Sequence, residues 1–402
     1  MRNPLRPRHL LHVTTVPMTL RFLRGQVGYM KKLGFEVEIA SSPGPELDNF
    51  GREEHVGVHA ISMERRIAPV KDLVSLYRLW RKIRRLNPEI VHSHTPKGGL
   101  LGMCAARLAG VPVCCYHLRG LPMMSAQGKK RELLRWTERL SCALADEVYC
   151  VSHSLRDVAL AEKLCDAEKI RVLAGGSGNG VDSLTTYNPN SADTASLNKM
   201  RAALGIAPDA LVIGYVGRLV QDKGIRELVE AWESIRSAIP KLHLLVIGPR
   251  EAADAVPERT LEVLDTDPEV TWLDMVPSVA PYYGLMDLLV LPTYREGFPN
   301  VLLEAAAMEI PVVATRVAGC VDAVLDGVTG TLVSKENAAE LADAMTAYLV
   351  SEELRDLHGK NARERVVKEF SQERIWQELA KRYEFQREQV DGALAPLEQG
   401  RS

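Results

Sequence analysis

The segment LVIGYVGRLVQDKGIRELVEAW (residues 211–232) decides the fold class of this chain. It begins with a mostly apolar, β-branched run that predicts a buried strand, and it ends with apolar residues at helical spacing. Gly217 and Arg218 form the turn between the two, and Lys223 and Gly224 lead into the helix. A strand that passes directly into a helix favours a parallel sheet with helices on its faces.

Strands and helices alternate in the same way on both sides of this segment. In the first half, strands are predicted at 10–16, 35–41, 58–63, 89–94, 112–117, 147–152 and 170–174. In the second half, they are predicted at 211–217, 241–248, 270–273, 288–292, 311–315 and 330–333. A polar, turn-rich stretch at 187–200 is predicted to link the halves. We therefore expect two doubly wound α/β domains whose ligands bind in a cleft at the carboxyl ends of the strands.

Length and composition agree with two globular domains. The chain has 402 residues, 46% hydrophobic and 25% charged, and no apolar run approaches the roughly 18 residues that a membrane span needs. The basic stretch 1–16 lacks a cleavage pattern and is interpreted as the lead into the first strand. Seven cysteines form no C-x-x-C pair, which predicts small core residues in a reducing compartment. Cysteine and histidine do not occur at zinc-like spacing, so no metal is expected.

The charge is distributed unevenly between the halves. Residues 1–184 contain 28 lysines and arginines against 18 acidic residues, whereas residues 185–402 contain 22 against 34. Basic residues gather at 77–88 and 128–140, which predict amphipathic helices with a basic face. A solvated face explains such helices, and peripheral contact with an anionic membrane is the alternative. Nucleic acid is not an expected partner, because neither run belongs to a recognisable nucleic-acid module.

The turn after strand 211–217 has the features of an anion site. Its glycine lets a ligand approach the backbone, and the following helix N-terminus offers free N–H groups. Arg218 and Lys223 add a forked donor and a point charge, a combination that suits a diphosphate. An ordinary charged surface loop is the alternative interpretation.

A second turn, REGFPNVLLEA (residues 295–305), follows strand 288–292. Gly297 loosens the turn, and Pro299 is predicted at the first helical position, where its missing N–H costs nothing. Glu296 and Glu304 lie at different depths and could accept hydrogen bonds from hydroxyls of two parts of one ligand. Three backbone amides are left for an anion or a sugar oxygen, those of Phe298, Asn300 and Val301.

Together these motifs carry a resemblance. GYVGRLVQDKGIRELVEAW, PTYREGFPNVLLEAAAMEIPVVAT and DGVTGTLV resemble family 4 of the retaining, nucleotide-sugar-dependent glycosyltransferases. HSHTPKGGLLG (92–102), HLRGLP (117–122) and GSGNGVD (176–182) are similar to the subgroup that extends lipid-linked sugars in bacterial capsule, exopolysaccharide and glycan-precursor assembly. The resemblance covers almost the whole chain and implies the GT-B fold, with two Rossmann-like domains.

The resemblance also implies a domain plan. Residues 1–184 would bind the acceptor and residues 185–370 the nucleotide-sugar donor. A helix at 371–392 would pack back on the first domain, and 393–402 would form a tail.

The site residues implied by the resemblance fall into three groups. The catalytic group is Arg218, Lys223, Glu296 and His117, with the two cations on the donor diphosphate and His117 facing the transferred sugar. The donor-binding group is Gly217, Glu304, Gly297, Phe298, Asn300, Val301 and Trp272, with Glu304 on the ribose and Trp272 beside the base. The acceptor-binding group is Lys97, Gly98, Gly99 and Arg119, with a phosphate at the helix that Lys97 opens. No cofactor or metal is implied, and the D-x-D at Asp265 and Asp267 is expected to be unrelated to the site.

The expected function is retaining transfer of a hexose or N-acetylhexosamine from a UDP-linked donor to a polyprenyl-diphosphate-linked saccharide. The expected location is the cytoplasm, at the inner face of the membrane. A nucleotide-sugar epimerase or hydrolase of the same fold, and a non-catalytic nucleotide-sugar-binding protein, are the alternatives.

Overall fold

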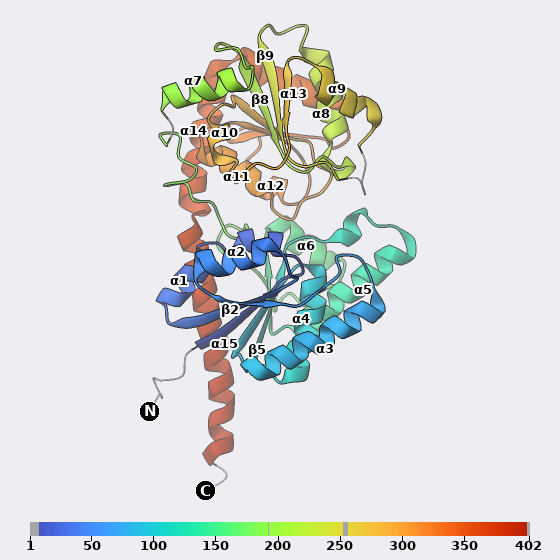
Figure 1. Ribbon diagram of the computed structural model, residues 1–402, viewed down its shortest axis with the longest axis vertical. Helices are drawn as coiled ribbons and strands as arrows, with labels where there is room; N and C mark the ends of the chain where they lie inside the picture. The colour runs from blue at the N-terminus through green and yellow to red at the C-terminus, as the bar shows by residue number, and fades with distance from the viewer. Residues whose placement is uncertain (1–7, 192, 252–255, 400–402) are drawn as a thin grey trace. The chain divides into compact units, whose positions relative to one another are not determined.

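The computed structural model describes residues 8–191, 193–251 and 256–399, and the chain divides into two compact units (Figure 1). The first unit comprises Met1–Asn179 and Gln372–Ser402, and the second comprises Gly180–Ser371. The stretch 187–200, predicted to be the linker, lies inside the second unit and contains the start of helix α7 (Thr194–Ala203). The linker prediction is wrong because Asp193 is the helix N-cap, accepting from the Ser196 amide at 2.8 Å, and cap residues and turn residues are the same types.

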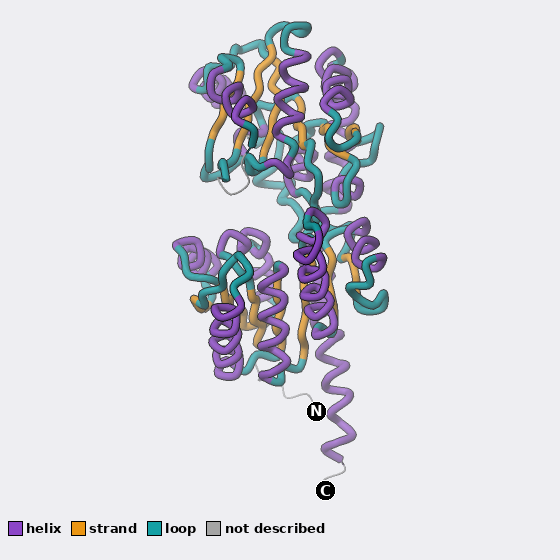
Figure 2. The backbone as a smooth tube through the Cα atoms, turned by 90° about the vertical axis from the view of Figure 1, so that its right-hand side faces the viewer, coloured by secondary structure: helices purple, strands orange, loops and turns teal. Residues whose placement is uncertain are grey.

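The first unit is built on a parallel sheet of seven strands in the order β3-β2-β1-β4-β5-β6-β7. Every strand predicted for the first half is present, with ends shifted by a few residues. The strands are β1 (Arg8–Val13), β2 (Phe35–Ser41), β3 (Gly57–Ala60), β4 (Ile90–His94), β5 (Val113–Leu118), β6 (Glu147–Cys150) and β7 (Ile170–Val172). The central strands β4 and β5 are buried along their whole length because helices cover both faces of the sheet (Figure 2).

The helices of the first unit occupy the crossovers between these strands. They are η1 (Pro17–Leu23), α1 (Gln26–Lys32), α2 (Pro45–Glu54), α3 (Pro69–Leu86), α4 (Pro96–Ala109), η2 (Pro122–Ser125), α5 (Gly128–Leu144) and α6 (His153–Ala161). Helix α4 packs against both α3 and α5, so these three form one layer. Helix α4 begins and ends as its sequence suggests, with Pro96 in its first turn and Gly110 at φ 77° after its last residue.

The final helix, α15 (Gln372–Gln399), belongs to the first unit. Its Leu379 and Tyr383 are buried in the same apolar cluster as Phe35 of β2, and Arg382 forms an ion pair with Glu147 of β6. The helix continues past residue 392, so no separate tail begins at 393.

The second unit is built on a parallel sheet of six strands in the order β10-β9-β8-β11-β12-β13. All six predicted strands are present: β8 (Leu211–Val216), β9 (Leu242–Ile247), β10 (Val270–Leu273), β11 (Leu288–Leu291), β12 (Val312–Thr315) and β13 (Gly330–Val333). Besides α7, the helices are η3 (Gln221–Lys223), α8 (Ile225–Ile235), α9 (Glu258–Thr266), α10 (Ala280–Tyr283), α11 (Asn300–Ala307), α12 (Cys320–Ala323), α13 (Ala338–Val350) and α14 (Glu352–Glu369). The predicted fold class, two doubly wound parallel α/β domains, is confirmed.

Among the described residues, no helix combines the length and the apolar character needed to cross a bilayer.

Candidate active site

The turns that follow β8 and β11 lie next to each other, because these two strands are neighbours in the sheet of the second unit. Gly224, at φ 67°, joins η3 to α8, and a Cβ at this position would lie 1.9 Å from the carbonyl oxygen of Pro292. Only glycine fits this close approach, and the left-handed backbone favours it as well. The glycine therefore lets the two turns meet.

Side chains from the two turns pair where they meet. The Lys223 ammonium donates to the Glu296 carboxylate, and each of these side chains is only 16% exposed. Arg295 pairs with Asp222 at 2.6 Å, and the Tyr294 amide donates to the Asp222 carbonyl oxygen at 2.9 Å. Two of the predicted catalytic residues are thus in direct contact, and the surrounding pairs fix their positions.

Arg218, the other predicted diphosphate ligand, extends from the end of β8. Its Nη1 donates to Glu251 Oε2 at 2.8 Å, and its carbonyl oxygen accepts from the Tyr215 hydroxyl at 3.0 Å. The preceding Gly217 lies against Gly248, where a Cβ would approach the Gly217 carbonyl oxygen to 1.9 Å. Glu251 was not among the predicted site residues. The sequence pattern that could have revealed Glu251 is present, since Gly248-Pro-Arg-Glu251 follows β9 just as Gly217-Arg218 follows β8.

Trp272, predicted to lie beside the base, belongs to the edge strand β10. Its Nε1 donates to the Gly248 carbonyl oxygen at 3.0 Å, and the Arg250 guanidinium lies over its ring at 3.9 Å from the centroid. Arg250 also donates from Nη1 to Asp265 at 3.1 Å. Sequence reasoning missed Arg250, although it lies in the same segment as Glu251. An indole face attracts a guanidinium placed over it, so this contact stabilises the positions of both side chains.

The D-x-D carboxylates are part of this edge of the sheet. Asp265 pairs with Arg250, and Asp267 accepts from Arg236 and from Trp232 Nε1, the latter at 3.1 Å. Both carboxylates therefore serve as partners of arginines in the fold.

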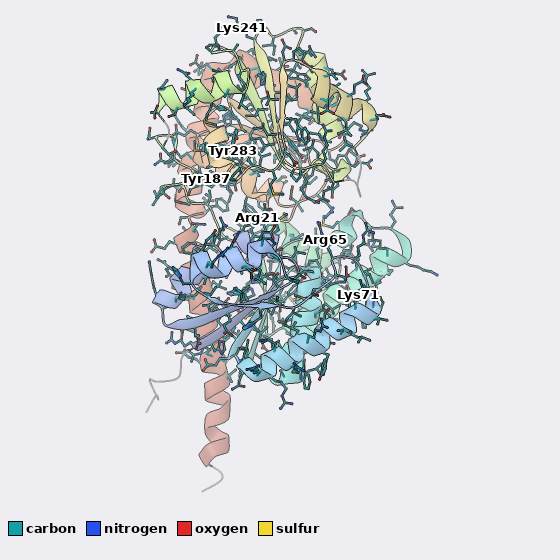
Figure 3. All side chains as sticks on the ribbon, viewed as in Figure 1. Arg21, Arg65, Lys71, Tyr187, Lys241 and Tyr283 are labelled. Carbon is teal, nitrogen blue, oxygen red and sulfur yellow. The ribbon has the colours of Figure 1, made fainter. Side chains whose placement is uncertain are left out.

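Glu304 lies on α11 and accepts from the Tyr283 hydroxyl at 2.8 Å. Tyr283 is fully buried and meets Tyr187 edge-on, with ring centroids 5.8 Å apart (Figure 3). Burial, with the Glu304 charge beside it, raises the pKa of Tyr283 well above its usual value, so its hydroxyl remains a donor. Tyr283 fixes Glu304 and was not predicted.

The β11–α11 turn differs in one detail from its prediction. Pro299 is the N-cap, and Asn300 and Val301 are the first two residues of helix α11. Gly297 lies against Gly319, where a Cβ would come within 2.6 Å of the Gly297 carbonyl oxygen. The Phe298 ring packs on Phe370, with centroids 5.5 Å apart. The predicted donor-binding residues are therefore gathered at one end of the second sheet.

In the first unit, His117 is one of four buried histidines that the register of the strands brings together. His12 of β1 pairs with His92 of β4, and His94 of β4 pairs with His117 of β5. All four are at most 3% exposed. The rings of His92 and His117 stack, with centroids 5.4 Å apart, and His117 Nδ1 has no hydrogen-bond partner among the described residues.

Arg119 determines which ring nitrogen of His94 carries the proton. Its Nη2 lies 3.2 Å from His94 Nδ1, and His94 Nε2 lies 2.9 Å from His12 Nδ1. Because a guanidinium only donates, His94 Nδ1 must accept. A neutral His94 then carries its proton on Nε2 and donates it to His12. Burial, with the charge of Arg119, lowers the pKa of His12 to about 3 and the pKa values of the other three well below their usual value.

Ligand atoms of His12, His92 and His94 lie within 4.8 Å of one another, a spacing that a metal ion could use. The arrangement does not fit one, because a metal on His94 Nε2 would need a proton on Nδ1, which faces the donor groups of Arg119. The positive charge of Arg119 opposes a cation as well. Among these neutral rings, one hydrogen bond joins His94 to His12, whereas His92 bonds to the Tyr383 hydroxyl.

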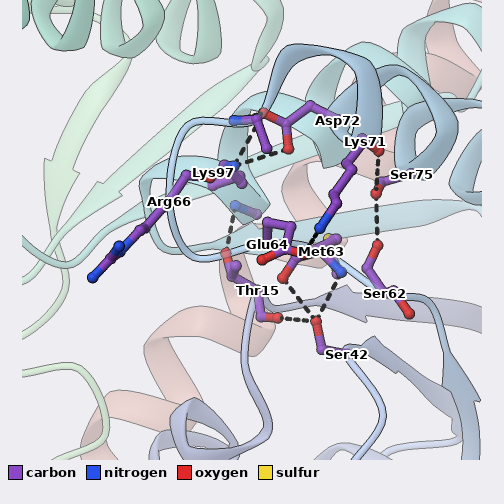
Figure 4. A network of polar contacts seen from close by, with 12 residues as sticks. Thr15, Ser42, Ser62, Met63, Glu64, Arg66, Lys71, Asp72, Ser75 and Lys97 are labelled. Carbon is purple, nitrogen blue, oxygen red and sulfur yellow. Dashed lines mark hydrogen bonds and ion pairs between the residues drawn. The ribbon is translucent and has the colours of Figure 1, made fainter.

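The start of α4, where an acceptor phosphate is predicted, is held by contacts within the first unit. Lys97 Nζ donates to Asp72 Oδ1 and Oδ2 at 2.8 and 3.0 Å and to the Arg66 carbonyl oxygen (Figure 4). The Gly98 amide donates to Thr15 Oγ1 at 2.8 Å, and the Gly99 amide donates to the Thr95 carbonyl oxygen at 2.6 Å.

That an acceptor phosphate binds where Lys97, Gly98 and Gly99 open the helix stays a prediction. Gly99 is required for packing, since a Cβ there would lie 2.2 Å from the Tyr116 ring. The sequence could not reveal the Lys97–Asp72 pair, which joins two helices.

The sequence of this chain is similar to those of known proteins along most of its length. A family model described as "Glycosyl transferase 4-like domain" matches residues 20–176, and one described as "Glycosyl transferases group 1" matches residues 210–351. The capsular polysaccharide biosynthesis glycosyltransferase CapM of Staphylococcus aureus is 35% identical over 379 residues, which cover 94% of this chain and 97% of that protein. An Escherichia coli relative, named UDP-Gal:alpha-D-GlcNAc-diphosphoundecaprenol alpha-1,3-galactosyltransferase, is 26% identical and covers 76% of this chain and 78% of its own.

Solved structures share the fold. Anabaena HepE in complex with UDP and glucose is similar with a TM-score of 0.78 at 18% identity, covering 94% of this chain and 99% of that chain. A glycosyltransferase from Rickettsia africae gives a TM-score of 0.77 at 19% identity, covering 94% and 97%. With both halves matched by family models and CapM similar over nearly its full length, the chain belongs to family 4 of the glycosyltransferases, with the GT-B fold.

Proposed function

We propose that this glycosyltransferase moves a hexose or an N-acetylhexosamine, with retention of configuration, from a UDP-linked donor to a hydroxyl of a polyprenyl-diphosphate-linked saccharide. The product would be part of a capsular or related surface polysaccharide. The observation that carries the proposal is the meeting of Lys223 and Glu296 at adjacent strand ends, with Arg218 on the same loop as Lys223. The name of the E. coli relative supports the acceptor class, and the name of the staphylococcal relative supports the product class.

The chemistry proposed for the second unit is electrostatic. Bond cleavage between the sugar and the diphosphate puts negative charge on the leaving phosphate oxygen. Lys223 and Arg218 would neutralise that charge from fixed positions, which is the most effective form of transition-state stabilisation. The departing phosphate oxygen would accept the proton of the attacking hydroxyl on the same face of the sugar, so no protein base is needed.

The remaining contacts fit the parts of a nucleotide sugar. The Glu296 carboxylate and the amides of the β11–α11 turn would bind sugar hydroxyls, and Glu304, fixed by Tyr283, would bind the ribose. The Trp272 indole with Arg250 on its face would lie beside the base. We propose that no metal is needed, because the two cations supply the charge that a divalent ion would bring.

Radiolabelled UDP-sugars offered with and without a polyprenyl-diphosphate-linked N-acetylglucosamine test the proposal. Label in the lipid extract, dependent on that acceptor and retained in the presence of a chelator, is the expected result. Free sugar or an epimer released without acceptor would identify the hydrolase or epimerase instead, and binding without any product would identify a non-catalytic protein.

Anomeric configuration of the labelled product, determined by NMR, separates retention from inversion. Cell fractionation tests the proposed location, which is the cytoplasm at the inner face of the membrane.

A further inference from the structure

Helix α3 exposes an apolar stripe that packing within the first unit does not use. Val70, Leu73, Val74 and Tyr77 follow the i, i+3, i+4, i+7 spacing of one helix face, and they are between 45% and 77% exposed. The core of the unit is served by another face, which buries Ser75, Leu79 and Ile83. One apolar face is enough to hold a surface helix in place, so the second face calls for a partner outside the unit.

Basic residues continue the same face toward the end of the helix. Arg81 and Arg84 lie in line with Val70 and Tyr77 at helical spacing and are exposed. We call Val70, Leu73, Val74, Tyr77, Arg81 and Arg84 the α3 outer face. The whole helix carries six basic residues and one acidic residue. That acidic residue, Asp72, is paired with Lys97 and so does not neutralise the face.

Most cations of this helix have no acidic partner in the part of the chain that the structure describes. Arg78, Arg81 and Arg85 have no acidic partner among the described residues, and Lys71, drawn on α3 in Figure 3, pairs with Glu64. An apolar centre with unpaired cations beside it is the pattern of helices that lie in the interface of an anionic bilayer. There, apolar side chains enter the acyl boundary and arginines bind lipid phosphates.

The same helical layer presents more side chains of this kind. Helix α5, on the other side of α4, exposes Leu133 and Trp136 at a spacing of three residues, with Lys129 and Lys130 exposed one turn earlier. Tryptophan is enriched at membrane–water interfaces. The sequence predicted basic helices at 77–88 and 128–140, but the apolar part of the α3 outer face begins earlier, at Val70.

We propose that the α3 outer face docks on an anionic lipid bilayer. A second copy of this chain fits less well, because a twofold contact would place this basic helix against itself. Nucleic acid does not fit the apolar centre, which offers nothing to a phosphate backbone. The inference deepens the proposed function, on which its biological meaning rests, since a lipid-linked acceptor is found at such a surface.

Co-sedimentation of the full chain with vesicles tests the docking without any turnover. Vesicles containing phosphatidylglycerol are compared with vesicles of phosphatidylcholine alone, at low and at high salt. We expect binding to the anionic vesicles that weakens as salt rises. In the docked state the Leu73 side chain would be buried in the bilayer. We therefore expect Leu73→Ser to bind about tenfold more weakly. Charge reversal in Arg81→Glu with Arg84→Glu predicts a loss of at least about tenfold.

Matched controls lie in the second unit. Val350 is 70% exposed and Arg259 has a side chain that is 81% exposed, so Val350→Ser and Arg259→Glu make changes of the same kind elsewhere, with one charge reversal in place of two. Thermal unfolding checks that all variants fold, and size-exclusion chromatography gives their oligomeric state.

The proposal is overturned by wild-type chain that stays in solution with anionic vesicles at low salt. It is equally overturned by α3 variants that bind like their controls, or by a dimer that Leu73→Ser dissociates. Transfer to a water-soluble acceptor analogue is measured in parallel. Transfer activity without vesicle binding would refute the docking alone, and vesicle binding without transfer would refute the proposed function alone.

Discussion

The Lys223 ammonium forms an ion pair with the Glu296 carboxylate, although the two residues are 73 positions apart in the sequence. Each belongs to a turn at the end of a strand, and the two strands are neighbours. The pair keeps a cation in place at the position where we propose that the diphosphate leaves. A diphosphate bound at this turn would compete with Glu296 for the Lys223 ammonium.

Removal of the Lys223 charge should slow turnover far more than it harms folding. We expect Lys223→Ala to lower kcat by about 10²–10³, as loss of one preorganised charge donor does. The free energy of unfolding should fall by about 1–3 kcal/mol, because Glu296 loses its partner. Steady-state kinetics and urea unfolding measure the two effects, with Lys335→Ala, at an exposed lysine of the same unit, as control. Near-normal kcat would remove Lys223 from the mechanism.

Gly224 should be irreplaceable for two separable reasons, its left-handed backbone and its contact with Pro292. Gly327 is the matched control, since it has φ 70° and a Cβ added there would have no atom within 4 Å. We expect Gly327→Ala to cost about 1 kcal/mol from the backbone alone. Gly224→Ala should cost clearly more, because the methyl group separates the two turns, and it should lower transfer activity as well. Equal losses of stability in the two variants would show that the close approach has no importance.

The buried histidines should make the fold sensitive to acid. The folded pKa of His12 is about 3, below the value of 6.5 for an exposed histidine. The unfolded chain therefore binds protons that the folded chain does not, and stability falls as the pH drops from about 6.5 toward about 3. From about pH 7.5 to about pH 5.5, one such histidine lowers the free energy of unfolding by about 1.4 kcal/mol.

Urea unfolding at a series of pH values measures this slope. Below about pH 6.5, the slope for His12→Asn should correspond to about one bound proton fewer than the slope for the wild-type chain. The exposed His55, changed to asparagine, controls for the loss of a histidine from the surface. A slope that His12→Asn leaves unchanged would mean that His12 is protonated in the folded chain. The groups that face the cluster are Arg119, whose charge adds to burial in lowering the pKa of His12, and the side chains of Tyr149 and Tyr383, which contact His92.

The Lys97–Asp72 pair should be structural. Lys97→Met leaves the largely buried Asp72 carboxylate unpaired and should cost about 1–3 kcal/mol of stability. The double variant Lys97→Met with Asp72→Asn should recover most of that loss, as measured by urea unfolding. The KM for the lipid-linked acceptor separates the alternatives: a stable double variant with a greatly raised KM would place Lys97 in the acceptor site.

Much of the fold could be predicted from the sequence, because each strand of a doubly wound sheet is a short apolar run and each crossover is a helix. The turns after β8 and β11 were predictable for the same reason, since functional residues follow strand ends. The predicted linker failed where a cap residue, Asp193, has the chemistry of a turn.

What the sequence could not show depends on register and on contacts between distant elements. HSH in β4 is only an alternating pair until β1 and β5 place His12 and His117 beside it. Lys97 looks like a free cation at a helix start until α3 supplies Asp72. Arg250 and Glu251 follow the end of β9 as Arg218 follows the end of β8, so their place beside the site could be predicted from the sequence.

The return of α15 to the first unit affects how the protein is made. Every strand of the first sheet has left the ribosome long before Tyr383, which completes the apolar cluster with Phe35 and hydrogen-bonds His92. We therefore expect that cluster to stay partly uncovered during synthesis, while the second unit, a continuous piece of chain, folds. The first unit, whose strands are synthesised first, would then be the last to complete its core. A chaperone that covers apolar surface would bind there.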